Sequence, residues 1–220
     1  MQPLWIIIPT AIAIGVTAFL VSRRMQEKRT EAMRRFARMR GFEFREKDAG
    51  VAVKTHLFKQ GHRGKSVNAL SRDDLGGKVV LFDYRYVRSA GQNSHVHTQT
   101  VAAFRHDGRS LPPFELRPEN VLDKVASVLG WMDIDFDNRP DFSSAYLLRG
   151  PDEAAIRRAF GTAVLAFFEK SRGWSVEAED PWLLVYRGSK CVKPEELEKF
   201  LEEARQVDDA FGTAGFARSS

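Results

Sequence analysis

The pattern of apolar and polar residues at the start of the chain differs from the pattern in the rest of it. An apolar run without charged side chains extends from Leu4 to Val21 and stops at Arg23 and Arg24. Its 18 residues would span about 27 Å as a helix, close to the thickness of the hydrocarbon core of a bilayer. The pattern therefore predicts a transmembrane anchor over residues 1–22, in contact with the lipid bilayer through Leu4 to Val21.

Residues 23–40 contain no Gly or Pro, and Met33, Phe36 and Ala37 recur at helical spacing. We therefore expect a helical stalk that ends at Gly41. The stalk has eight basic and two acidic side chains, so the positive-inside rule places this flank and the following domain in the cytoplasm and the N-terminus outside. The basic residues expected at the membrane surface are Arg23, Arg24, Lys28, Arg29, Arg34 and Arg35.

Period-two alternation dominates the first part of the remaining chain. The segment 79–87 predicts a strand. One of its faces carries Val80, Phe82 and the neighbouring aromatic residues. A polar turn around Gly91 then leads into a partner strand over residues 95–104. A second hairpin is predicted over 174–178 and 182–186.

Helical spacing appears between these strands and after them. The pattern predicts helices from Pro118 to Gly130, from Asp152, after Thr162, and from Pro194. The fold class is therefore α+β: an antiparallel sheet of about six to eight strands with helices packed on it. We expect this domain to cover residues 41–208 and a loose tail to cover 209–220.

The distribution of charge changes what the basic composition means. The chain has a net charge of +5, but residues 41–220 hold 26 basic and 27 acidic side chains. The excess positive charge belongs to the stalk, where membrane topology and anionic headgroups explain it, and nucleic acid is not an expected partner. Because Cys191 is the lone cysteine, an intramolecular disulfide is excluded, which fits a reducing compartment.

Two groups of polar residues are candidates for a site. His95 and His97 share a strand face, and a hairpin centred near Gly91 would place them beside Asp83 and Arg85. Such a group could bind a metal or act in acid–base chemistry, or it could be a solvated polar face. No third metal ligand is evident nearby, and no nucleotide or cofactor motif is present.

The second group consists of two arginines. Arg117 alternates with Glu115 and Glu119, and Arg149 precedes Asp152 and Glu153. These arginines either form ion pairs or line a pocket for a carboxylate or phosphate, which the guanidinium group binds well.

Five segments resemble a family of small membrane-anchored bacterial proteins of unknown function. They are LFDYRY (81–86), QTVAAF (99–104), PPFELRPEN (112–120), DIDFD (133–137) and YLLRGPDE (146–153). The resemblance covers roughly residues 40–205 and implies a bacterial inner-membrane protein with one cytoplasmic domain. It implies no activity and no site residues.

The sequence thus predicts a single-pass membrane protein whose domain binds a protein or a small anionic ligand at the cytoplasmic face. The alternative is a membrane-tethered hydrolase that uses Asp83, His95 and His97. Ala11 and Gly15 form a small-xxx-small pair, which leaves homodimerisation through the anchor open.

Overall fold

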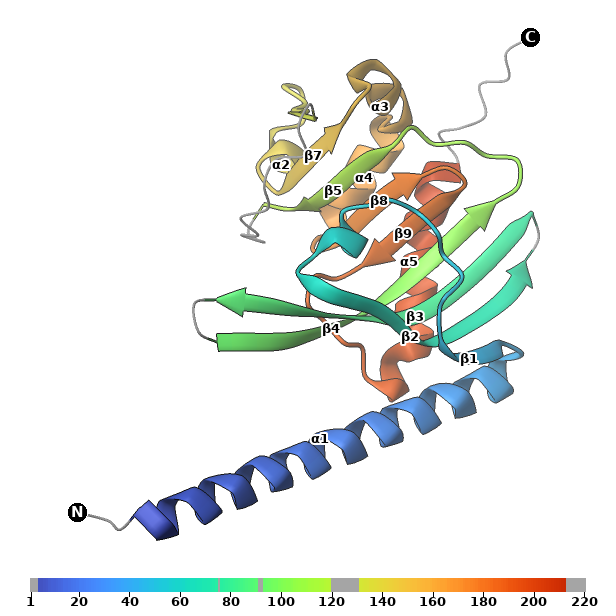
Figure 1. Ribbon diagram of the computed structural model, residues 1–220. Coiled ribbons are helices and arrows are strands. Elements are labelled where there is room, and N and C mark those ends of the chain that lie inside the picture. The colour runs from blue at the N-terminus through green and yellow to red at the C-terminus, as the bar shows by residue number, and fades with distance from the viewer. Residues whose placement is uncertain (1–3, 75, 91–92, 120–130, 213–220) are drawn as a thin grey trace.

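A computed structural model describes residues 4–74, 76–90, 93–119 and 131–212 of the chain, with residues 4–12, 14, 90 and 93 described by backbone alone. Residues 120–130 of the predicted helix and residues 213–220 of the predicted tail therefore lie outside the described residues. Pro118 ends a strand (Phe114–Pro118) instead of opening a helix, and residues 209–212 belong to the last helix (Leu197–Gly212) instead of the tail. Within the described residues the fold is α+β, as predicted (Figure 1).

The described strands form one antiparallel sheet of nine strands, in the order β1-β2-β3-β4-β9-β8-β5-β7-β6. The strands are β1 (Glu43–Lys47), β2 (His62–Asp74), β3 (Gly77–Ala90), β4 (Asn93–His106), β5 (Phe114–Pro118), β6 (Met132–Asp133), β7 (Tyr146–Gly150), β8 (Ser175–Glu179) and β9 (Trp182–Tyr186). Both predicted hairpins are confirmed. The first, β3–β4, is longer than its pattern indicated and projects beyond the rest of the sheet (Figure 1).

Helices cover one face of this sheet. They are α1 (Leu4–Arg40), α2 (Pro140–Ser143), α3 (Glu153–Ala159), α4 (Thr162–Lys170) and α5 (Leu197–Gly212), with 3-10 turns η1 (Leu57–Lys59) and η2 (Pro194–Glu196). A buried aromatic cluster, which includes Phe114, Phe160, Phe168 and Phe211, joins the sheet to α3, α4 and α5. We call this side of the sheet the helical face.

The opposite face is covered by the chain between β1 and β2. Phe82, Tyr84 and Tyr86 point to this side, where Leu57 and Phe58 pack over them. The backbone of this connecting segment, residues 48–60, is held to the sheet by side chains, because Glu179 accepts a hydrogen bond from the Lys54 amide at 3.0 Å. We call this side the strap face.

Helix α1 crosses the helical face along β1 and β2 and continues away from the domain as one helix (Figure 1). Its C-terminal part belongs to the core, since Met33, Phe36 and Ala37 are buried. Gly41 ends it in a left-handed conformation (φ 67°), as the sequence predicted. The predicted helix over 23–40 is therefore present, and its second half packs on the sheet.

The first half of α1 contains the predicted anchor. Among the residues that the structure describes, no helix is both long enough and apolar enough to cross a membrane. The side chains from Leu4 to Ile12 lie outside the described part, as does that of Ala11 in the small-xxx-small pair. From Val16 onward they are described, and Val16, Phe19, Leu20 and Val21 are more than half exposed.

Candidate functional site

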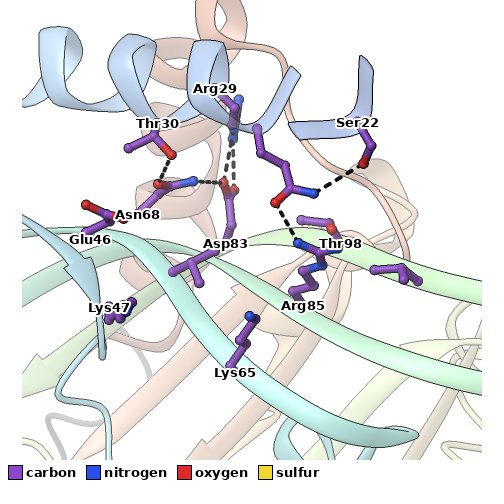
Figure 2. Close-up of a pocket in the computed structure, with 13 residues that line it drawn as sticks. Ser22, Arg29, Thr30, Glu46, Lys47, Lys65, Asn68, Asp83, Arg85 and Thr98 are labelled. Atoms are coloured by element: carbon purple, nitrogen blue, oxygen red, sulfur yellow. Dashed lines mark hydrogen bonds and ion pairs between the residues drawn. The ribbon is translucent and has the colours of Figure 1, made fainter. Parts of the chain in front are cut away.

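A cavity of about 440 Å³ lies between α1 and the helical face of β1, β2, β3 and β4. Its floor contains a buried ion pair (Figure 2). Arg29 of α1 donates to both carboxylate oxygens of Asp83 on β3, from Nε at 3.1 Å and from Nη2 at 2.9 Å. Asp83 is 1% exposed, so its carboxylate is shielded from water.

Both oxygens of the Asp83 carboxylate accept two hydrogen bonds each. Asn68 donates to Asp83 from Nδ2 at 3.1 Å, and the Thr100 hydroxyl donates at 3.0 Å. Asn68 has a positive φ of 53° at an irregularity in the pairing of β2 with β3 between Val67 and Leu70. Bulges of this kind re-aim side chains, and asparagine tolerates the left-handed conformation. Asp83 is therefore a structural anion with four donors.

The same network ties α1 to a distant loop. Arg29 also donates from Nη1 to the Val192 carbonyl, and the Val192 amide donates to the Thr100 hydroxyl at 3.0 Å. Burial alone would lower the pKa of Arg29, but the hydrogen bond and charge of Asp83 outweigh burial and raise it. The floor of the cavity thus fixes α1 at one position on the sheet.

Three further cations line the cavity above this floor: Lys47, Lys65 and Arg85. Lys65 and Arg85 are direct partners in the β2–β3 ladder, and Figure 2 shows both rising from the sheet toward α1. Like charges opposite one another on neighbouring strands are unfavourable unless an anion lies between them. Since Arg29 and Asp83 neutralise each other, Glu46 is the acidic side chain that remains in this lining.

Uncharged donors complete the wall of the cavity. Arg85 donates to the Gln26 side-chain oxygen at 2.8 Å, and the Gln26 amide donates to the Ser22 hydroxyl at 3.4 Å. Thr98 of β4 faces the same space (Figure 2). Guanidinium, ammonium, amide and hydroxyl groups together are the donors that bind phosphate, sulfate or carboxylate groups.

The predicted histidine group is not at this site. The observed register pairs Tyr86 with His97 and Arg88 with His95, which is shifted by one residue from the register of a hairpin centred at Gly91. A shift of one residue moves every side chain to the other face. His97 therefore stacks on Tyr86 on the strap face, with ring centroids 5.3 Å apart, whereas Asp83 and Arg85 face α1.

This register removes the geometric basis of the hydrolase alternative. Asp83 lies across the sheet from His95 and His97 and is committed to Arg29. Within the described residues, no group of three or more histidine, cysteine, aspartate or glutamate side chains is placed to bind a metal.

Arg117 and Arg149 lie on the strap face of β5 and β7, among carboxylates. Arg149 is opposite Glu115 in the ladder and forms an ion pair with Asp133. Arg117 Nε lies 3.7 Å from Glu115 Oε1. These contacts match the ion-pair interpretation of both residues, and neither arginine lines the cavity beneath α1.

A second polar cluster, which sequence patterns did not reveal, is buried beside Glu115. Glu177 of β8 is opposite Glu115 in the ladder, and it accepts hydrogen bonds from the Tyr186 hydroxyl and from the Leu57 amide. Burial, with the charge of Glu115 second, raises the pKa of Glu177, and burial also raises the pKa of Tyr186. The neighbouring cavity is only about 10 Å³, so this cluster holds the strap in place and has no room for a ligand.

The basic residues of α1 divide into two sets. Arg23, Arg24, Lys28 and Arg35 are exposed, and their place at a membrane surface stays a prediction. Arg29 instead points into the protein, and Arg34 pairs with Glu31 at 3.0 Å. Helical periodicity could have indicated this, because Arg29 lies one turn before buried Met33 on the same side of the helix.

Comparison with known proteins defines the fold only. No family model matches the chain, and no curated protein matches it. Among solved structures, the mycobacterial trehalose monomycolate transport factor A, TtfA, is similar, with a TM-score of 0.61 and 14% sequence identity. The match covers 82% of this chain and 93% of that protein. The resemblance to small membrane-anchored bacterial proteins stays a prediction.

Proposed function

We propose that this protein is a membrane-attached binding module, and that the cavity beneath α1 binds the anionic headgroup of an amphipathic ligand. The observation that supports the proposal best is that Lys47, Lys65 and Arg85 line one cavity beside an ion pair, Arg29 with Asp83, whose charges already cancel. A carboxylate, sulfate or phosphate group in this space would neutralise the cross-strand pair of cations.

Membrane attachment through residues 4–21 is part of this proposal. Its support is the uncharged apolar sequence, the exposed apolar side chains from Val16 to Val21, and the basic residues that follow. The same charge pattern favours a cytoplasmic domain at the inner membrane. Ser22 and Gln26 line the cavity, so the mouth of the cavity would open next to the headgroup layer.

The structural likeness to a transport factor is compatible with this role. That protein's name assigns it to transport of trehalose monomycolate, and the likeness to it is one of fold. We propose that the present chain has a lipid-binding or transport-related role, with a ligand whose headgroup carries negative charge.

Titration of the full chain in neutral detergent tests the proposal. The probes are dihexanoyl phosphatidic acid, dihexanoyl phosphatidylcholine and inorganic phosphate, and calorimetry measures the binding of each. We expect the acidic lipid to bind and the zwitterionic lipid to bind at least about tenfold more weakly, as the loss of one charge-assisted contact predicts. Binding of inorganic phosphate with equal affinity would identify a phosphate site and exclude lipid recognition.

Two variants and one control locate the binding site. Lys65→Glu and Arg85→Glu should each abolish binding of the acidic lipid. Lys170→Glu reverses a charge at the exposed end of α4 and should leave binding unchanged. Equal affinities in all three variants would contradict the proposed cavity.

A further inference from the structure

The projecting end of the β2–β3–β4 ribbon is strongly basic. Residues 59–69 and 84–98 contain no Asp or Glu. They contain five lysines and arginines and three histidines: Lys59, His62, Arg63, Lys65, Arg85, Arg88, His95 and His97. We call these two segments the basic ribbon end. The rest of the domain after residue 40 carries an excess of acidic side chains, so the positive charge is concentrated here.

Most of the cationic side chains of the basic ribbon end are open to solvent. His62, Arg63, Lys65 and His95 are exposed, and Val96, an apolar residue, is 53% exposed. Arg88 lies over the Tyr86 ring at 5.8 Å, which holds its guanidinium close to the sheet. An exposed surface of one charge is costly in self-repulsion and is typical of a surface that meets an anionic partner.

The position of this end identifies the partner. Asp83 of β3 contacts Arg29 of α1, and Arg85, two residues further along the strand, contacts Gln26. Strand β3 therefore runs toward the N-terminal end of α1. Figure 1 shows the ribbon end and the start of α1 on the same side of the molecule. From Arg85 to Ala90 the strand extends about 17 Å, whereas from Gln26 to Val21 the helix rises only about 7.5 Å.

The ribbon end therefore reaches the level at which the apolar part of α1 begins. We propose that the basic ribbon end rests on the anionic phospholipid surface of the bilayer that the N-terminal segment enters. This inference rests on the proposed membrane attachment. Lys65 and Arg85 of the basic ribbon end also line the cavity, so the test below uses residues outside that lining. Each lysine or arginine near such a surface contributes about 1 kcal/mol of attraction.

Fluorescence quenching in vesicles containing the full chain tests this contact. In a Cys191→Ser background, which removes the lone cysteine, Ser94→Cys carries an environment-sensitive dye, because Ser94 is exposed and does not line the cavity. Vesicles of phosphatidylglycerol and phosphatidylcholine, or of phosphatidylcholine alone, carry a quencher on their headgroups. We expect strong quenching in the anionic vesicles, weak quenching in the zwitterionic ones, and loss of quenching in high salt.

Two controls make the result specific. A dye at Asp107→Cys, in the turn after β4 at the opposite end of the ribbon, should stay unquenched. The double variant Arg63→Glu with Arg88→Glu should weaken the quenching by at least about tenfold, as expected for two surface cations. Neither residue lines the cavity, so this variant should bind the acidic lipid in detergent normally.

The outcomes separate this inference from the attachment on which it rests. A protein that floats with anionic vesicles while the dye at Ser94→Cys stays unquenched would retain its attachment and overturn the ribbon contact. Quenching that is equal in the double variant and the parent would also overturn it. A protein that does not float with vesicles would overturn both the attachment and the contact.

Discussion

Arg29 on α1 and Asp83 on β3 are 54 residues apart in the sequence and form a two-point ion pair in the interior of the protein. The Asp83 side chain is 1% exposed and that of Arg29 is 14% exposed. Because both charges have left water, the pair holds α1 at a defined place, and the loss of either partner leaves the other charge buried without compensation.

Replacement of Asp83 by Asn should therefore be strongly destabilising. Asp83→Asn leaves Arg29 buried and unpaired, and we expect a loss of about 3–5 kcal/mol in the free energy of unfolding. Urea denaturation followed by circular dichroism measures this loss. The exposed pair of Arg157 with Glu153 is the matched control. Glu153→Gln should cost at most about 0.5 kcal/mol, and an equal loss in both variants would contradict a buried pair.

Lys65→Glu should separate stability from ligand binding. The variant converts the cross-strand pair of Lys65 and Arg85 into one of opposite charge, which should raise the free energy of unfolding by about 0.5 kcal/mol. The same variant should lose affinity for the acidic lipid. Thermal denaturation and lipid titration of one preparation measure both quantities. A destabilised variant would show that Lys65 has a structural role.

The raised pKa of Glu177 predicts the sign of one pH dependence. A carboxyl group whose pKa is higher in the folded state favours folding most when it is protonated. The stability that it provides is complete below its ordinary pKa of about 4.5 and is lost as the pH rises toward the folded value. Glu177→Gln removes this titration.

Denaturation of the parent and of Glu177→Gln over a series of pH values measures this effect. The stability of the parent relative to the variant should fall as the pH rises above about 4.5. A relative stability that rises with pH would contradict the predicted sign.

Gly77 is a position where any side chain should clash. A Cβ atom added there would lie 1.7 Å from the Arg105 carbonyl oxygen, whereas one added at Gly108 would have no atom within 4 Å. We expect Gly77→Ala to cost about 1–3 kcal/mol, in the range of overpacking substitutions. Gly108→Ala should be neutral. Urea denaturation of the two variants measures the difference, and equal midpoints would contradict the close approach of β3 and β4.

Local patterns predicted those parts of the fold that each strand or helix encodes by itself. Alternation from Val79 to Val87 indicated a strand because one of its faces packs under the strap. A helical start at Pro194 was also readable, since proline fits the first turn of a helix; Pro194 opens the 3-10 turn η2, and α5 follows from Leu197. Such features depend on neighbours in sequence, so they can be recognised without the fold.

The candidate site could be predicted only in part, because its parts come from distant segments. Asp83 and Arg85 were identified, but the predicted register placed His95 and His97 beside them. Nothing in a turn of small and polar residues distinguishes the predicted register from one shifted by a single residue. This shift nevertheless decides which face of the sheet the histidines occupy. The partnership of Arg29 with Asp83 has no local signal at all.

The unbroken course of α1 has a mechanical consequence. The helix runs from Leu4 to Arg40 without an interruption, and its second half is fastened to the sheet through Arg29 and Met33. Each residue of a helix turns its successor by about 100°, so the rotational phase of the N-terminal segment is coupled directly to that of the domain. The contacts that hold the second half of α1 on the sheet therefore also set the orientation of the N-terminal segment about the helix axis.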